Sequence, residues 1–436
     1  MYSLVERFSL STPGTKQIWY FAMSLLLFQS CRKDDDLQSP VIRIETPVTG
    51  DTFYFLNTIS IRATIQDDRQ IESVKLEVTN SQNVRFLETK EFFPADNTFS
   101  LNYTITQNDL YLTSGTYYIK ISATDGSTES IVFREIQLIE APRFLERLFV
   151  VRDIGGSADI DTLHNNSLMS CLNFPQPFLF GGIDSRTQQL VISGNSPSSL
   201  LSYSYPDFET INASFPPNNE LITSFYHDKE HHCFLWGTQQ GNIWRTSVTG
   251  TQLFTTVGVL PVINIGAHSN YIIASTQGSA NNFIYVIRND NGIIESALPF
   301  SWELKGIIEL SADNSRVLLV GNENSAAHFA WLNFNTVSFN EVFNFYETSP
   351  VQSAYSGSGN DFYAVHENGL AHYTNAIDNY TINADLIPNK LIFDDLGNTL
   401  YAVNENELRV LDQQGLSTLQ TIAAPGITDV WLKYNK

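Results

Sequence analysis

Short apolar segments recur along the second two-thirds of the chain. Each has four residues, and there are seven: LFVV at 148–151, LVIS at 190–193, CFLW at 233–236, IIAS at 272–275, VLLV at 317–320, FYAV at 362–365 and LYAV at 400–403. The steps between their last residues are 42, 43, 39, 45, 45 and 38. A short apolar run bounded by turn residues is typical of a buried β-strand, so the pattern predicts one such strand per repeat.

Three further strands are expected in each repeat. One precedes the apolar segment, as in PFLFGGID at 177–184 and LITSFYHD at 221–228. Another follows a loop rich in Gly and Asn, as in FIYVIRND at 283–290, and the fourth is irregular, as in FETINAS at 208–214. Four short strands in a unit of about 40–45 residues are the signature of a β-propeller blade.

The two ends of this region are incomplete in complementary ways. The first apolar segment has no strand before it, and the chain finishes on ITDVWLKYNK at 427–436, which matches a first strand with nothing after it. We therefore expect the ends to share one blade, with Ile427 to Tyr434 innermost beside Leu148 to Val151. Such pairing covers strand edges that would otherwise template aggregation. Residues 145–436 are thus predicted to form a seven-bladed propeller in an all-β protein.

Residues 40–141 show strict alternation of apolar and polar residues between turns. In GTYYIKISATDG at 115–126, Tyr117, Ile119 and Ile121 point one way while Tyr118 and Lys120 point the other. This stretch resembles the sixth strand of bacterial Ig-like or PKD-like β-sandwiches, whose Tyr forms a tyrosine corner. The resemblance implies one sandwich, which we interpret as a spacer.

Three aspartates fall in the expected turns of this sandwich: Asp67, Asp68 and Asp125. We favour turn capping for them, since Asp side chains accept hydrogen bonds from nearby backbone N–H groups. Calcium binding between domains is the alternative, and no other cofactor is expected.

The N-terminus reads as a targeting segment. An apolar core at 18–28 follows Arg7 and Lys16, and its length suits a signal peptide better than a membrane span. It ends in LFQSC, which resembles a bacterial lipobox with lipidation at Cys31. Residues 1–30 would then be the signal peptide and 31–39 an acidic tether, whose RKDDD resembles a tag for export to the outer face of the outer membrane.

Charge and cysteine content narrow the functional classes. The net charge of −21 argues against nucleic acid, whose phosphates need clustered Lys and Arg. Only three cysteines are present, Cys31, Cys171 and Cys233, so no disulfide framework is indicated. A catalytic motif is also missing, and His231-His232 is a poor metal pair because adjacent strand residues face opposite sides. We therefore predict a protein that is not an enzyme and holds no metal.

Candidate ligand-binding residues come from the loops at one end of the propeller. The loops between second and third strands are rich in amides and hydroxyls, which suit sugar hydroxyls or peptide backbone, although Asn and Gly are also ordinary turn formers. The connections between blades add aromatic rings: Phe174, Phe215, Trp302 and Tyr346. The predicted set is Arg152, Asp153, Asn195, Gln239, Gln240, Asn281, Trp302, Asn322, Glu323, Tyr346, His366, Glu367, Asn404 and Glu405.

The expected domain order resembles that of accessory lipoproteins of TonB-dependent, SusCD-like uptake systems. That resemblance implies capture of a glycan, peptide or vitamin-like ligand at the propeller mouth, on a chain anchored to the outer membrane by lipid alone and monomeric by itself. Its partner would be a transporter complex. Two alternatives stay open: a protein–protein platform in the cell envelope, and a propeller glycosidase or lyase using a carboxylate pair.

Overall fold

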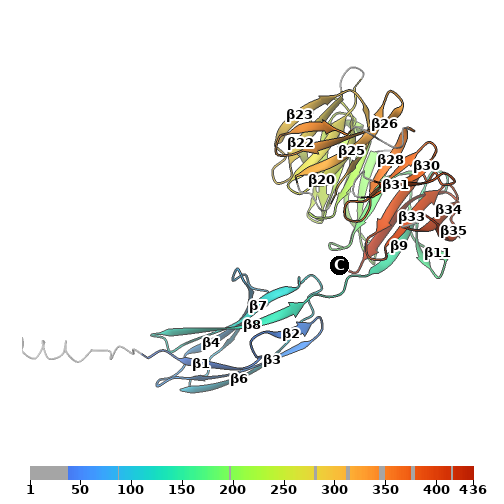
Figure 1. The fold of residues 1–436 in the computed structure, drawn as a ribbon. Helices are drawn as coiled ribbons and strands as arrows, with labels where there is room; N and C mark the ends of the chain where they lie inside the picture. Colours follow the sequence, from blue (N-terminus) through green and yellow to red (C-terminus); the bar gives the residue numbers. More distant parts are fainter. Residues whose placement is uncertain are drawn as a thin grey trace, which may run out of the picture. The chain divides into compact units, whose positions relative to one another are not determined.

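The protein is described by a computed structural model over residues 38–86, 88–195, 198–278, 282–310, 315–342, 349–374, 379–413 and 416–436. Two compact units meet between Pro142 and Arg143. Over the described residues the regular structure is β-strand apart from one 3-10 turn at Pro217–Asn219, so the predicted all-β class is confirmed (Figure 1). No helix in this part of the chain is long and apolar enough to cross a membrane.

The first unit is a two-sheet sandwich. One sheet has the order β1 (Val41–Thr46), β3 (Thr58–Gln66) and β6 (Thr98–Thr106). The other has the order β2 (Asp51–Tyr54), β8 (Glu129–Ile139), β7 (Gly115–Thr124), β4 (Ser73–Asn80) and β5 (Lys90–Phe92), with β2 parallel to β8. Alternating residues such as Ile59, Ile61, Ile119 and Ile121 fill the space between the sheets. The short edge strands β2 and β5 are additions that the sequence pattern did not predict.

The tyrosine corner predicted at Tyr117 is present. Its ring is buried, and its hydroxyl donates a 2.9 Å hydrogen bond to the backbone carbonyl of Thr113. The nearby aspartates cap turns: Asp67 Oδ1 accepts from the N–H of Arg69, and Asp125 Oδ1 accepts from the N–H groups of Ser127 and Thr128. These contacts hold the loops at one end of the sandwich in shape.

The second unit is a propeller of seven four-stranded antiparallel sheets, as predicted. Blades 1 to 3 are β12 (Phe178–Asp184) to β15 (Thr210–Ser214), β16 (Ile222–Asp228) to β19 (Gly250–Thr256) and β20 (Val262–His268) to β23 (Ile294–Phe300). Blades 4 to 6 are β24 (Glu303–Ile308) to β27 (Ser338–Glu341), β28 (Val351–Ser356) to β31 (Asn379–Asn383) and β32 (Lys390–Asp394) to β35 (Thr418–Ala423). The recurring apolar segments lie in the second strand of each of these blades: β13 (Gln189–Asn195), β17 (Cys233–Thr238), β21 (Tyr271–Thr276), β25 (Arg316–Glu323), β29 (Phe362–His366) and β33 (Thr399–Asn404).

Blade 7 joins the two ends of the propeller sequence. Its strand order is β11 (Ser167–Phe174), β10 (Ala158–His164), β9 (Leu145–Asp153) and β36 (Ile427–Tyr434). Trp431 pairs with Phe149 and Leu432 with Leu148, which confirms the predicted closure with β36 innermost. Neighbouring blades then pack through apolar clusters, such as the one that unites Phe149 and Trp431 of blade 7 with Ile183 and Leu190 of blade 1.

The innermost strands share an irregularity that the sequence did not reveal. In blades 1 to 5 and in blade 7, the pairing between the first and second strands skips one residue of the first strand. In blade 4 the skipped residue is Lys305, and in blade 5 it is Gln352. Such β-bulges bend a strand and change the direction of a side chain, and they occur at the same level in each of these blades.

Candidate functional site

The direction of the strands decides which loops of the propeller lie together. Successive strands of a blade are antiparallel, so the turn between its second and third strands lies at the same end as its connection to the next blade. We call this end the mouth face, and the end that carries the other two turns the opposite face. The loops chosen from the sequence all belong to the mouth face.

A cavity of about 650 Å³ opens on the mouth face between blades 4 and 5. Four of the predicted residues contribute to it: Trp302, Asn322, Glu323 and Glu367. The other lining residues are Ser301, Glu303, Lys305, Asn324, Ser325, Pro350, Val351 and Gln352. The cavity lies within the range of about 300–1,000 Å³ that is usual for small-molecule sites.

Local backbone geometry shapes the cavity wall. The skipped residues of the two inner-strand bulges, Lys305 and Gln352, both line it. The hairpin between β25 and β26 (Ala326–Asn333) turns at Asn324 and Ser325, with φ of 51° and 63°. Two consecutive residues with positive φ fit a type I′ turn, which is the tight hairpin turn that matches strand twist. This tight turn holds Glu323 at the rim.

Two hydrogen bonds between lining residues connect blade 4 to blade 5 at the cavity. Asn322 Nδ2 donates to the carbonyl of Val351 at 2.8 Å, and the N–H of Val351 donates to Asn322 Oδ1 at 2.7 Å. Trp302 is buried at 6% exposure against Phe300 and His328, and Gly321 leaves no room there for a Cβ atom. Asn322 therefore holds the two blades together, and little of the Trp302 ring is exposed to the cavity.

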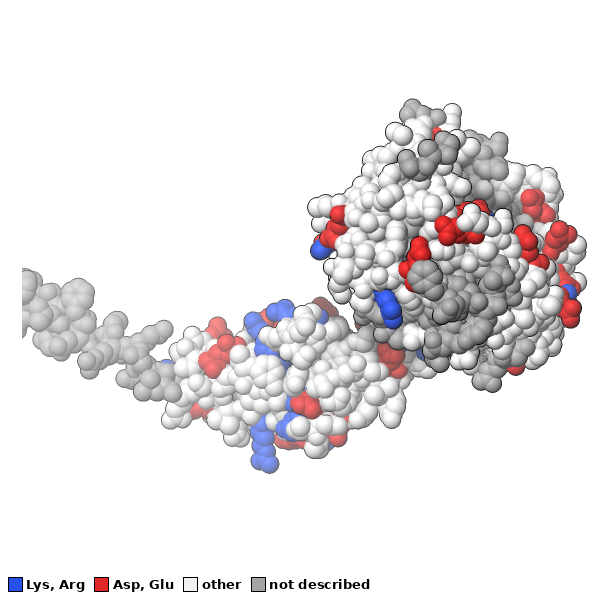
Figure 2. All heavy atoms as spheres, turned by 45° about the horizontal axis from the view of Figure 1, so that its top comes forward, with Lys and Arg blue, Asp and Glu red and all other residues white. Residues whose placement is uncertain are grey.

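The rim of the cavity is predominantly acidic. Glu303 Oε1 accepts a 2.6 Å hydrogen bond from Lys305 Nζ. Glu323 accepts from Ser301 Oγ at 3.3 Å and lies 3.5 Å from His328 Nδ1. Glu367 is exposed, and its backbone N–H donates to Pro350. Acidic side chains also outnumber basic ones on the propeller surface in view in Figure 2.

The remaining described members of the predicted set are spread around the mouth face and are not among the described residues that line this cavity. Gln239 and Gln240 are exposed on blade 2, and Asn404 and Glu405 lie at the equivalent turn of blade 6. In blade 7, Arg152 donates to the buried carboxylate of Asp161 within its own sheet. Asp153 caps the following turn by accepting from the N–H of Gly155. The described members of the predicted set therefore do not meet at one common site.

Several expectations require correction. His366 is completely buried, with Nδ1 2.7 Å from the carbonyl of Ser349 and Nε2 3.0 Å from the hydroxyl of Tyr373, so it cannot face a ligand. Phe174 and Trp302 are buried, and the expectation that they present stacking faces is wrong because both fill contacts within or between sheets. Phe215 is 61% exposed and keeps an open ring.

Some predicted positions are not described. Cys31, Asn281 and Tyr346 lie outside the described residues, as do residues 1–30 and most of the tether, and the side chain of Asn195 is not described either. Among the described residues no group of three or more His, Cys, Asp and Glu side chains is arranged to hold a metal ion.

The adjacent histidines 231 and 232 bind two different aspartates on the opposite face. His231 Nδ1 lies 3.0 Å from Asp228 Oδ2, while His232 Nδ1 lies 3.1 Å from Asp184 Oδ2. Asp184 also receives His227 Nε2 at 3.0 Å. Although burial opposes it, the contact with His227 and the hydrogen bonds from Thr187 hold the pKa of Asp184 below its usual range. His227 and His232 thus link blade 2 to blade 1, whereas His231 pairs with an aspartate of its own blade.

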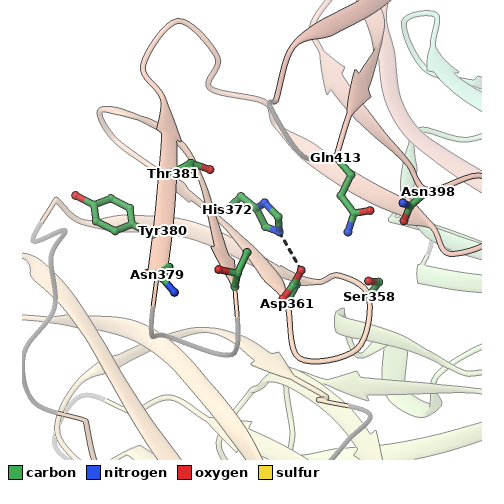
Figure 3. Close-up of a pocket in the computed structure, with 9 residues that line it drawn as sticks. Ser358, Asp361, His372, Asn379, Tyr380, Thr381, Asn398 and Gln413 are labelled. Atoms are coloured by element: carbon green, nitrogen blue, oxygen red, sulfur yellow. Dashed lines mark ion pairs between the residues drawn. The ribbon is translucent and has the colours of Figure 1, made fainter.

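The opposite face carries a second cavity, of about 420 Å³, between blades 5 and 6 (Figure 3). Sequence reasoning missed it, because its central residue His372 lies inside β30 (Gly369–Thr374), where nothing in the strand pattern distinguishes a site from a buried position. The other lining residues are Ser358, Asp361, Thr374, Asn379, Tyr380, Thr381, Asn398 and Gln413.

Comparisons with known proteins support the architecture. Residues 40–121 match the family model for a bacterial Ig domain. No curated protein sequence matches the chain. Among solved structures, a protein from Lactobacillus plantarum aligns with a TM-score of 0.53 and 14% identity over 67% of this chain and 100% of its own. A functionally unknown protein from Desulfotomaculum acetoxidans aligns with a TM-score of 0.50 and 11% identity over 66% and 98%.

A dihydro-heme d1 dehydrogenase, NirN, covers 72% of this chain and 72% of its own at 10% identity, with a TM-score of 0.47. At such identities the similarity extends to the fold alone. The proteins from Lactobacillus plantarum and Desulfotomaculum acetoxidans align with 67% and 66% of this chain, and residues 143–436 make up a similar fraction of it. The propeller is therefore the part that they have in common with this chain.

Proposed function

We propose that this protein is a cell-surface lipoprotein that captures a nutrient ligand at the mouth face, without chemical change, for an outer-membrane transporter. One observation carries the binding role. Trp302, Asn322, Glu323 and Glu367 were selected from loop sequences of two different blades, and they line one cavity of about 650 Å³. A cavity of this kind, with a few fixed polar groups, is the usual form of a small-molecule site.

The charges around the cavity favour a ligand with a positive group. Its described lining residues include three carboxylates, those of Glu303, Glu323 and Glu367, and one cation, Lys305, which is paired with Glu303. Residues 143–436 hold 28 Asp and Glu against 13 Lys and Arg, which leaves −15. A surface of one sign raises the local concentration of ligands of the other sign. A peptide with a basic side chain or a free amino terminus meets this condition, and so does a glycan with an amino sugar.

The cellular location rests on the sequence features alone. The lipobox-like LFQSC would leave Cys31 lipidated, and two or more acyl chains are enough for stable anchoring. The Ig-like module would then act as a spacer between the anchor and the propeller. Under this proposal the membrane is contacted through the lipid only.

Binding can be tested by isothermal titration of residues 31–436 with short basic peptides and with chitosan oligosaccharides. The double variant Glu323→Gln/Glu367→Gln removes two rim charges and should weaken binding by at least tenfold, or about 1.4 kcal/mol. Glu405→Gln, on the equivalent turn of blade 6, is the matched control and should bind like the wild type. If the double variant and the Glu405→Gln control bind equally well, the proposed site is contradicted. If the oligosaccharide is cleaved, the protein is an enzyme and the proposal of binding without chemical change is wrong.

A second candidate function, a protein–protein platform, has its own supporting observation. Three apolar side chains on neighbouring blade connections of the mouth face are exposed: Phe215, Leu221 and Val259. Exposed apolar groups of this kind mark interaction surfaces when they are contiguous. Two results together would favour this candidate. No ligand would bind in the titrations, and the double variant Phe215→Ser/Val259→Ser would no longer copurify with outer-membrane proteins that copurify with the wild type.

A further inference from the structure

The cavity of the opposite face has the composition of a binding site. It draws side chains from two blades: Ser358 and Asp361 come from the first turn of blade 5, and Asn398 and Gln413 come from turns of blade 6. No Lys or Arg is found among its described lining residues. Figure 3 shows His372 and Gln413 directed toward the space that separates the two blades.

His372 is the unusual member of the set. It is 5% exposed and stacks on Tyr363, with ring centroids 4.6 Å apart and an angle of 17° between the planes. Its Nε2 faces Asp361 Oδ2 at 3.5 Å, the distance of a weak ion pair, and makes no hydrogen bond of ordinary geometry with the described residues. Burial lowers the pKa of His372, while Asp361 acts in the opposite direction. A buried nitrogen that makes no good hydrogen bond is energetically unfavourable, and a hydrogen bond from a ligand would remove this cost.

The other lining side chains indicate which kind of ligand could hydrogen-bond His372. Besides His372 and the Asp361 carboxylate, the cavity is lined by four hydroxyl-bearing and three amide-bearing side chains: Ser358, Thr374, Tyr380, Thr381, Asn379, Asn398 and Gln413. Amides and hydroxyls donate and accept at once, and a carboxylate accepts two hydrogen bonds side by side. Vicinal hydroxyls of a sugar ring present the same mixture. An anionic ligand is disfavoured, because it would lie near the Asp361 carboxylate and no Lys or Arg is among the described lining residues.

We infer that this cavity binds a neutral saccharide, with His372 Nε2 and Asp361 holding adjacent hydroxyls, at a site independent of the mouth-face cavity. The size is adequate, since about 420 Å³ lies inside the usual range for small-molecule sites. The inference does not depend on the proposed function, because the described residues that line the two cavities form separate sets.

The test uses residues 31–436 and saturation-transfer NMR with glucose, galactose, mannose, maltose, lactose and cellobiose, followed by titration of any sugar that binds. His372→Phe keeps a planar ring on Tyr363 and removes Nε2, and we expect at least tenfold weaker binding. Asn379→Ala changes an exposed rim amide and serves as a second variant that leaves the buried packing intact. It should weaken the same sugar, while Glu323→Gln should have no effect.

A direct readout is the ¹⁵N shift of the His372 imidazole. A ligand hydroxyl that hydrogen-bonds Nε2 will move this resonance on addition of sugar, and Asn379→Ala will reduce the response. If none of these sugars binds, or if binding is unchanged in both His372→Phe and Asn379→Ala, the inference is overturned. Binding of basic peptides at the mouth face would stand in either case.

Discussion

Removal of the Trp431 side chain tests how the propeller ring is closed. Trp431 is 4% exposed and packs across the junction of blades 7 and 1, with its ring 6.0 Å from that of Phe178. A Cβ added at Gly181 would lie 2.5 Å from Trp431 Cζ2, so the indole fills the space left by this glycine. Collapse of the blade around a smaller residue is therefore restricted, and Trp431→Ala should leave a cavity.

The expected cost is large compared with the stability of a typical domain. Replacement of a buried Trp by Ala costs about 3–5 kcal/mol, while whole domains are stable by about 5–15 kcal/mol. At about 2–4 °C for each kcal/mol, Tm should fall by about 6–20 °C. Deletion of residues 427–436 should go further, because it also removes the buried Ile427, Val430 and Tyr434.

Tryptophan fluorescence is a clean assay for this prediction. Residues 38–142 contain no Trp, and residues 143–436 contain five, so the signal of a protein spanning residues 38–436 reports on the propeller alone. Trp331→Phe is the control for loss of one reporter, since Trp331 is only partly buried beneath Arg316. A Trp431→Ala protein that melts within about 2 °C of the wild type, a shift below about 1 kcal/mol, would refute closure through this interface.

Three further predictions concern single hydrogen bonds and charges. Tyr117→Phe should lower sandwich stability by about 0.5–1.5 kcal/mol through loss of the bond to Thr113, read as the sandwich transition in calorimetry, with the propeller transition unchanged. Asn322→Ala leaves the buried N–H and C=O of Val351 unpaired and should cost about 2–3 kcal/mol, whereas Glu323→Gln should melt like the wild type. Burial raises the pKa of Glu309 above its ordinary 4.5 although Tyr226 donates to it, so its ionisation opposes folding at pH 7. Glu309→Gln should raise Tm at pH 7, and this gain should disappear as the pH falls through the raised pKa toward 4.5; a gain that is constant with pH would show that its charge is not the cause.

The sequence by itself determined the architecture of this protein. Apolar segments at regular spacing leave little choice of fold, because each repeat exposes an apolar face that only neighbouring repeats can cover. The incomplete first repeat and the terminal ITDVWLKYNK likewise required a shared blade, and β36 beside β9 is the result. In the sandwich, the alternation around Tyr117 predicted its burial, and the resemblance to a strand of Ig-like domains implied its corner hydrogen bond.

Only the tertiary structure decided which polar loop residues meet. His366 and Glu367 are adjacent in the sequence, yet the first is buried on Tyr373 and the second lines a cavity, because the last residue of a strand and the first of a turn face different surroundings. Lys305 lines the same cavity because it lies at a β-bulge, which the local sequence pattern does not predict. His372 becomes a candidate binding residue only because the fold places it next to Asp361 and beside blade 6. Such sites depend on contacts between distant segments, whereas strand patterns depend on neighbours along the chain.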